Sequence, residues 1–247
     1  MTIIFPMAGL SSRFNKAGYT LPKYMLNLQE KSVFFWVLEG FKTYFKTNDF
    51  LFIYRNINHT KEFIKQECQK LNLKNYQSVE LDSPTLGQAH TVALGLEKIG
   101  IKDSILIFNI DTLRPNFHLP QNLDLDKIDG YLEVFKSEGE QWSFIKASDE
   151  KLCKVAKTAE KTRISSFCSS GLYYFRKSEE FLSIFKTMQE KNNLEKGEFY
   201  IAPMYNELIK RNADIRYELI ALNQILFCGT PREYEALKKL NLSQKFL

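Results

Sequence analysis

The strongest constraint on the fold is an alternation of short apolar runs with helical patterns along the first 110 residues. The apolar runs are residues 2–5, 50–54 and 104–110. The helical patterns are residues 33–45, 61–71 and 88–99. The run at 104–110 (SILIFNI) is almost continuously apolar, which is typical of a strand in a parallel sheet that is covered on both faces. The alternation therefore predicts an α/β fold with a doubly wound sheet.

From residue 129 onward the pattern changes to closely spaced strands joined by polar turns. The expected strands are residues 131–135, 142–147, 155–158, 172–175 and 215–222. The expected helices are residues 178–189, 199–211 and 232–240. No linker or internal repeat separates the two halves. We therefore predict one domain over residues 1–247, in which a first half (1–128) is followed by a smaller β-rich lobe (129–247).

Charge and composition exclude several classes of protein. The 247 residues carry a formal net charge of +5, a mild surplus that favours anionic small molecules but is too scattered to indicate nucleic-acid binding. The four cysteines form no C-x-x-C pair, so neither a zinc site nor a disulfide framework is expected. The N-terminus lacks a basic leader, and no apolar run approaches the ~18 residues of a membrane span. We expect a cytoplasmic protein without membrane insertion.

The loop after the first strand is the most informative segment. Residues 7–14 (MAGLSSRF) are mostly small, and residues 21–23 (LPK) follow shortly after. Small residues let backbone N–H groups approach an anion, while Arg13 offers a fork of donors and Lys23 a compact charge. The pattern is neither a Walker A loop nor a dinucleotide fingerprint. From the residues alone, a phosphate-binding loop and an ordinary basic surface loop both stay open.

Two further features are expected at the same edge of the sheet. Gly87 precedes the helix at 88–99, and a glycine there lets a flat base lie against the backbone. Asp111 follows the buried strand, at the carboxyl end where open α/β sheets bind ligands, and a carboxylate suits Mg²⁺. Taken singly, Gly87 is better explained as an ordinary helix start, and Asp111 is equally compatible with an aspartate that caps a turn.

In series, these segments resemble the nucleotidyltransferases that join an NTP to a phosphorylated acceptor, the sugar-nucleotide pyrophosphorylases and cytidylyltransferases with a GT-A-like, Rossmann-like fold. Their A-G-x-G-[ST]-R…P-K signature is similar to residues 8–13 and 22–23, although Ser stands at position 11 where many members have Gly, and Ser resists positive φ. The resemblance implies nucleotide binding by Ala8, Gly9, Ser11, Ser12, Arg13, Lys23, Gly87 and Gln88. It also implies that Asp111 is the ligand of a Mg²⁺ cofactor.

The second half adds expected acceptor contacts. Residues 155–165 and 171–175 resemble the family's V…E-K…I-S and G-[IL]-Y segments, which implies acceptor binding by Glu160, Lys161, Gly171 and Tyr173. Lys161 would meet the acceptor phosphate and, with Arg13 and Lys23, act in catalysis. Sugar-nucleotide members carry a second metal aspartate where this chain has Phe227, and Glu198 and Asp214 are unranked candidates to replace it. Without the resemblance, Glu160 and Lys161 would read as a solvated turn pair.

The expected activity follows from the resemblance. It implies an Mg²⁺-dependent nucleotidyltransferase that releases pyrophosphate. Within the family, the sequence of residues 11–26 is most similar to that of the capsule-locus cytidylyltransferases. That branch implies CTP and a phosphoglutamine-type acceptor in capsular polysaccharide precursor synthesis. UTP or dTTP, a sugar 1-phosphate or phosphocholine acceptor, a GT-A glycosyltransferase and a non-catalytic nucleotide-binding relative stay open as alternatives. A homodimer stays open as well.

Overall fold

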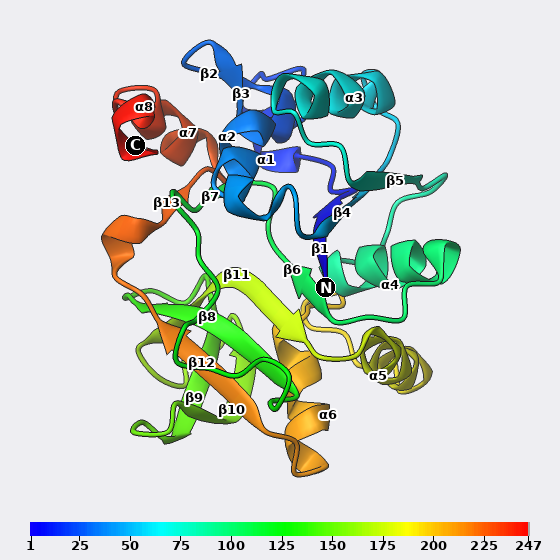
Figure 1. The fold of residues 1–247 in the computed structure, drawn as a ribbon, viewed down its shortest axis with the longest axis vertical. Helices are drawn as coiled ribbons and strands as arrows, with labels where there is room; N and C mark the ends of the chain where they lie inside the picture. The colour runs from blue at the N-terminus through cyan, green and yellow to red at the C-terminus, as the bar shows by residue number, and fades with distance from the viewer. Residues whose placement is uncertain (247) are drawn as a thin grey trace.

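A computed structural model describes residues 1–246, and a single mixed sheet runs through it (Figure 1). Within residues 1–246, nine strands pair in the order β5-β4-β1-β6-β11-β8-β12-β10-β9. They are β1 (Thr2–Met7), β4 (Asp49–Tyr54), β5 (Tyr76–Glu80), β6 (Ile105–Ile107), β8 (Gly130–Lys136), β9 (Ser143–Asp149), β10 (Lys154–Glu160), β11 (Phe167–Phe175) and β12 (Ile215–Leu219). Strands β4, β1 and β6 are parallel, whereas β11 is antiparallel to β6 and β8. The predicted α/β fold with a doubly wound mixed sheet is confirmed.

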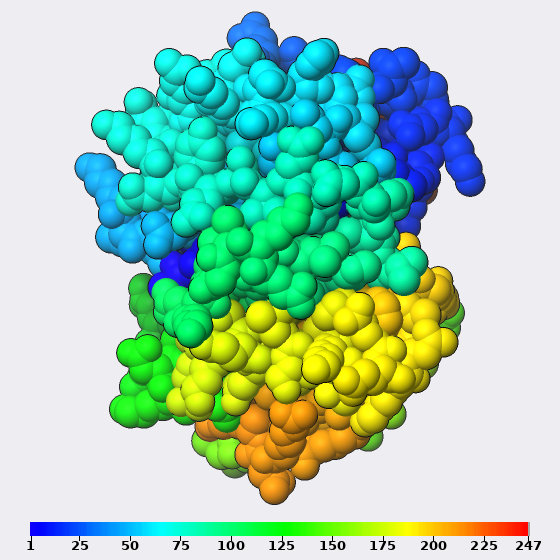
Figure 2. All heavy atoms as spheres, turned by 90° about the vertical axis from the view of Figure 1, so that its right-hand side faces the viewer, coloured from blue at the N-terminus to red at the C-terminus, as the bar shows by residue number. Residues whose placement is uncertain are grey.

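Helices cover both faces of this sheet. The first face packs against α2 (Val33–Glu39), α3 (Thr60–Lys70), α7 (Pro231–Leu237) and α8 (Leu242–Lys245). The second face packs against α4 (Gln88–Ile99), α5 (Ser178–Glu190) and α6 (Tyr205–Lys210). Successive side chains of a strand point to opposite faces, so Ile3 and Phe5 of β1 enter the first core and Ile4 the second. Figure 2 shows α4 (green) and α5 (yellow) side by side on the second face.

Several short elements lie outside the nine-stranded sheet. They are α1 (Ser12–Lys16), β2 (Asn27–Leu28), β3 (Lys31–Ser32), β7 (Thr112–Leu113) and β13 (Leu226–Phe227). Strand β13 pairs antiparallel with β7, which brings the late segment around residue 227 beside the segment that follows Asp111. Among the described residues, no helix is both long and apolar enough to cross a bilayer.

Strand β11 joins the two halves of the molecule. It pairs with β6 of the first half and with β8 and β9 of the second, and every one of its residues is buried. Its pairing register with β8 shifts between Ser169 and Tyr173, around Gly171, whose φ is +91°. A side chain at Gly171 would collide with the Asn109 amide. The bulge therefore brings the backbone of β11 against the segment that leads to Asp111.

Some predicted elements differ from the observed ones. The helix expected over 199–211 is shorter: a 3₁₀ turn at Ala202–Met204 leads into α6, because the backbone of Phe199 bonds instead to Leu86 and Ala89. The apolar run 104–110 forms only the short strand β6. The loop expected after β1 contains α1, and the edge strand β5 was not predicted, since Val79 is its one buried residue.

A buried ion pair holds the strand after Asp111 to the sheet. The Arg114 Nε lies 3.1 and 3.0 Å from the two carboxylate oxygens of Glu133, and both side chains are almost fully buried. Strand β12 pairs with β8, and this places Glu218 of β12 beside Glu133 of β8. Burial, and secondarily the negative charge of Glu133, raises the pKa of Glu218 to about 7. This network lies outside the clefts described next.

Candidate active site

Two clefts meet at Asp111, beyond the carboxyl ends of β1 and β6. The first cleft has a volume of about 380 Å³ and is lined by Pro6, Met7, Ala8, Gly9, Leu10, Ser12, Lys23, Tyr24, Pro84, Thr85, Gly87, Thr91, Ile110 and Glu198. The second cleft has a volume of about 520 Å³ and is lined by Arg13, Thr112, Gln141, Trp142, Ser143, Glu160, Ser169, Ser170, Gly171, Tyr173, Tyr200, Phe227, Gly229, Thr230 and Glu233. Gln88, Asn109 and Asp111 line both clefts and form the wall between them.

The loop of the first cleft has the backbone conformation that its sequence disfavours. Ser11 has φ 52° and ψ 32°, so it adopts the left-handed conformation despite its side chain. Its hydroxyl accepts a hydrogen bond from the backbone N–H of Lys23 at 3.1 Å, and its carbonyl accepts from Phe14 and Asn15. The hydroxyl thus fastens the loop to the segment that carries Lys23. Ser11 itself is not part of the lining of the first cleft, although its neighbours are.

Gly87 is required by a close backbone contact. It has φ +103°, and an added Cβ would lie 2.7 Å from the carbonyl oxygen and 2.8 Å from the nitrogen of Phe199. Phe199 donates to the carbonyl of Leu86 at 2.7 Å, and Ala89 donates to the carbonyl of Phe199 at 3.0 Å. After this turn, the Gln88 amide donates to the Asn109 carbonyl oxygen at 2.6 Å. The predicted base-side loop is therefore locked onto a segment more than a hundred residues away.

Two of the three predicted cationic residues, Arg13 and Lys23, lie on either side of Asp111. Lys23 Nζ lies 2.6 Å from Asp111 Oδ2, and both side chains are largely buried. Lys23 faces the first cleft, whereas Arg13 lines the second, with Asp111 between them. The structure therefore brings the N-terminal loop together with an aspartate that follows it by about ninety residues.

A carboxylate that the sequence analysis missed lies next to Asp111. An added Cβ on Gly229 would lie 3.0 Å from Asp111 Oδ2 and 3.7 Å from Glu233 Oε2, so the two carboxylates flank this glycine. Glu233 was hidden because it is also the capping-box residue of α7, where it accepts from the N–H of Thr230 at 2.9 Å. The S/T-x-x-E spacing at residues 230–233 was the available signal.

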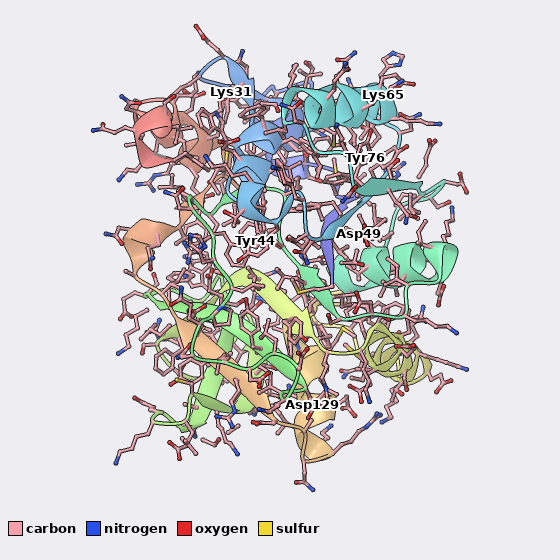
Figure 3. The ribbon with its side chains drawn as sticks, viewed as in Figure 1. Lys31, Tyr44, Asp49, Lys65, Tyr76 and Asp129 are labelled. Carbon is pink, nitrogen blue, oxygen red and sulfur yellow. The ribbon has the colours of Figure 1, made fainter. Side chains whose placement is uncertain are left out.

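The two earlier candidates for a second carboxylate lie elsewhere. Glu198 lines the first cleft. Asp214 bonds to Arg216 at 2.5 Å, and its backbone N–H donates to Asp129, which Figure 3 labels near the lower end of the molecule. Asp214 lines neither cleft, so Glu233 takes its place as the nearer carboxylate.

The acceptor residues predicted from β10 and β11 divide into two groups. Glu160, Gly171 and Tyr173 line the second cleft. Lys161 does not; its ammonium bonds to the hydroxyl of Tyr200 and lies 4.4 Å from the centre of that ring. Glu160 is almost fully buried and accepts from the Ser143 hydroxyl, and burial raises its pKa. Burial also raises the pKa of Tyr173 to about 12.

The fold and the comparisons with known proteins define the class of protein. No protein-family model and no curated protein matches the sequence. Among solved structures, the nucleoside-diphosphate-sugar pyrophosphorylase from Vibrio cholerae RC9 is 44% identical, with coverage of 96% of this chain and 100% of that one and a TM-score of 0.91. The protein is thus a nucleotidyltransferase. It belongs to the family of the nucleoside-diphosphate-sugar pyrophosphorylases.

Two more distant structures share the fold. The inositol-1-phosphate CTP transferase from T. maritima is 13% identical, with coverage of 96% of this chain and 94% of that one and a TM-score of 0.73. A UDP-glucose pyrophosphorylase complexed with UDP-glucose is 17% identical, with 98% coverage of both chains and a TM-score of 0.76. At these identities the likeness concerns the architecture alone.

Proposed function

We propose that the protein transfers a cytidylyl group from CTP to a phosphorylated small-molecule acceptor and releases pyrophosphate. The observation that carries this proposal is the Lys23–Asp111 pair in the wall between two clefts, with Arg13 on its other side. Each cleft has the size of a small-molecule site. A triphosphate in the first cleft and a phosphate ester in the second would meet at this wall.

The proposed step is an in-line displacement. An oxygen of the acceptor phosphate attacks the α-phosphorus of CTP, and a new P–O bond forms as the bond to the oxygen that bridges to the β-phosphate breaks. The electron pair of the broken bond leaves with pyrophosphate, whose charge Lys23 offsets on the side of the first cleft, while Arg13, which lines the second cleft, offsets the charge of the acceptor phosphate. An ionised phosphate is already nucleophilic, so positioning and charge neutralisation supply the catalysis without a general base.

The residues present fit a magnesium ion that is shared with the substrate. Among residues 1–246, no group of three or more His, Cys, Asp and Glu side chains is placed to hold a metal by itself. Mg²⁺ commonly takes one or two carboxylates together with phosphate oxygens and water. We propose Asp111 as its ligand, with Glu233 as the further carboxylate at hand. Bound there, the ion would offset charge at the α-phosphate.

The nucleotide and the acceptor are proposed on different grounds. The resemblance of residues 11–26 to capsule-locus cytidylyltransferases supports CTP. The same resemblance supports a phosphoglutamine-type acceptor, a role in capsular polysaccharide precursor synthesis and a cytoplasmic location. A sugar 1-phosphate is the second candidate acceptor, because the Vibrio cholerae relative is described as a nucleoside-diphosphate-sugar pyrophosphorylase. A glycosyltransferase is disfavoured because the two cations on either side of Asp111, Lys23 and Arg13, suit two substrates that both carry phosphate.

One assay tests the proposal. The protein is incubated with each of CTP, UTP and dTTP, Mg²⁺ and a panel of phosphate esters, and pyrophosphate release is followed. We expect release with CTP that depends on both the acceptor and Mg²⁺. Release with no pairing would overturn the proposed activity, and a preference for UTP or dTTP would overturn the choice of nucleotide.

A further inference from the structure

One wall of the second cleft is built from aromatic rings. The ring centres of Trp142 and Phe227 lie 4.8 Å apart at an interplanar angle of 44°. Both rings rest on the buried Phe135, at 5.2 and 5.3 Å. The Trp142 Nε1–H donates to the carbonyl of Glu138, so the polar edge of the indole is already engaged. Both side chains line the second cleft, so they give this wall aromatic surface without a free hydrogen-bonding group.

The same cleft carries an excess of negative charge. Of the charged side chains in its lining, three are carboxylates (Asp111, Glu160 and Glu233) and one is a guanidinium (Arg13). Asp111 is already paired with Lys23, and Glu233 caps a helix. Glu160 is buried, accepts a hydrogen bond from the Ser143 hydroxyl and is paired with Lys161 Nζ at 4.0 Å, the outer limit of an ion pair. The lining as a whole still holds more carboxylates than cations, so this cleft favours a cationic group.

Lys161 shows that this part of the molecule accommodates an ammonium group. Its ammonium lies over the face of Tyr200 and near Glu160, which is the combination of ring face and carboxylate that stabilises an alkylammonium ion. Tyr200 lines the second cleft, and Lys161 does not. The other aromatic residues of the lining are Trp142, Tyr173 and Phe227, and Tyr173 is almost fully buried. Trp142 and Phe227 are only partly buried and can contact a ligand in the cleft.

We infer that the acceptor carries an ammonium group remote from its phosphate, and that this group binds between Glu160 and the faces of Trp142 and Phe227. The inference rests on the proposed function, since it assigns the second cleft to the acceptor. A neutral sugar could stack on these rings but carries no positive charge to offset the carboxylates of the lining. An amino-acid phosphate and a phosphocholine-like ester both meet the requirement.

The test compares two acceptors of matched shape. Phosphocholine and 3,3-dimethylbutyl phosphate differ in that a quaternary carbon replaces the charged nitrogen. With CTP and Mg²⁺, we expect kcat/KM for pyrophosphate release to be about tenfold or more higher for phosphocholine. Glu160→Gln, which keeps an oxygen for Ser143, and Phe227→Leu, which keeps apolar volume, should each reduce this ratio severalfold. Glu140→Gln, an exposed carboxylate outside the cleft, should leave the ratio unchanged.

Binding separates failure of the inference from failure of the proposed function. The same two esters, and glucose 1-phosphate, are titrated calorimetrically into protein that contains CMP. Turnover of glucose 1-phosphate or the neutral ester at rates equal to phosphocholine overturns the inference and leaves the activity standing. A different outcome is that phosphocholine binds more tightly than the other esters, that Glu160→Gln abolishes this preference, and that no ester is turned over. This outcome supports the ammonium site and overturns the activity. No preference in binding or in turnover overturns the ammonium site.

Discussion

The two clefts on either side of Asp111 are lined by different kinds of residue. The first is formed mainly by backbone and small residues in two short loops, at residues 6–12 and 84–88, with Lys23 as its cation. The second is formed by large aromatic and acidic side chains that come from distant parts of the chain. Backbone N–H groups and one cation suit phosphates, which every NTP carries. Side-chain shape and charge suit the recognition of one particular acceptor. The residues that bind the nucleotide are therefore largely different from those that select the acceptor.

A change in the shared wall should damage both sides. Asp111→Asn keeps the shape of the side chain and removes the charge that faces Lys23 and, in our proposal, Mg²⁺. We expect kcat to fall by about 10²–10³-fold, since charge neutralisation is the main catalytic contribution. Steady-state pyrophosphate release measures the loss, and a thermal melt confirms that the variant is folded. A rate within a few fold of the original would show that Asp111 is not the metal ligand.

A change at Gly87, which lines only the first cleft, should affect the nucleotide more than the acceptor. Gly87→Ala forces a Cβ against the backbone of Phe199, so the loop must shift. We expect the KM for CTP to rise about tenfold and the KM for the acceptor to rise less, because only the neighbouring Gln88 and Tyr200 reach the second cleft. The measurement is a pair of titrations, each with the other substrate saturating.

The other end of the same helix supplies the control for that variant. Gly100 also has a positive φ, +71°, but open space surrounds the position of its Cβ. Gly100→Ala should therefore cost about 1 kcal/mol of folding stability from backbone strain and leave both KM values unchanged. Equal effects of the two variants on the KM for CTP would mean that strain, and not the contact with Phe199, explains the Gly87 result.

A smaller effect on both substrates is expected at Asn109. Asn109→Ala removes the acceptor of the Gln88 hydrogen bond in the wall that both clefts share. Loss of one such bond predicts a rise of about fivefold in each KM. Asn122→Ala, an exposed position outside both clefts, is the control. A rise in the KM of only one substrate would contradict the assignment of Asn109 to a wall that both clefts share.

The smallest effect concerns stability and neither cleft. The pKa of Glu218 is raised from 4.5 to about 7, so the folded protein holds a proton that the unfolded chain releases between these values. By linkage, the stability from this group is present below pH 4.5 and is lost as the pH rises through 7. Glu218→Gln cannot ionise and escapes this loss. We expect its Tm to match the original near pH 4.5 and to exceed it by about 2–4 °C at pH 8, a modest gain because solvent screens the group. A pH-independent difference would contradict this account.

Much of the fold is readable because its signals are local. The helix at 88–99 and Pro231 at the start of α7 were predicted from spacing and helix-terminus chemistry, and both are observed. The helix expected from residue 199 failed because backbone bonds to Leu86 and Ala89, more than a hundred residues earlier, take its first turn. Strand β5 escaped because an edge strand with one buried residue lacks a clear apolar alternation.

The candidate site likewise has one part that could be predicted from the sequence and another part that could not. The loop of the first cleft could be predicted because its function depends on consecutive small residues followed by Arg13 and Lys23. The aromatic wall could not, because Trp142, Tyr200 and Phe227 share no spacing and meet only through the sheet order and the β7–β13 pairing. Glu233 was obscured by its role as a helix cap. The catalytic and binding roles assigned to these residues stay predictions until the assays are done.

The left-handed Ser11 has a consequence for the speed of substrate capture. The Ser11 hydroxyl accepts a hydrogen bond from the backbone N–H of Lys23, and the Ser11 carbonyl accepts from Phe14 and Asn15, so contacts within the protein itself fix this turn. The conformational entropy of ordering the turn is therefore lost during folding and not during complex formation. Association of the triphosphate should consequently follow a single exponential whose rate increases linearly with nucleotide concentration, without a slow isomerisation phase.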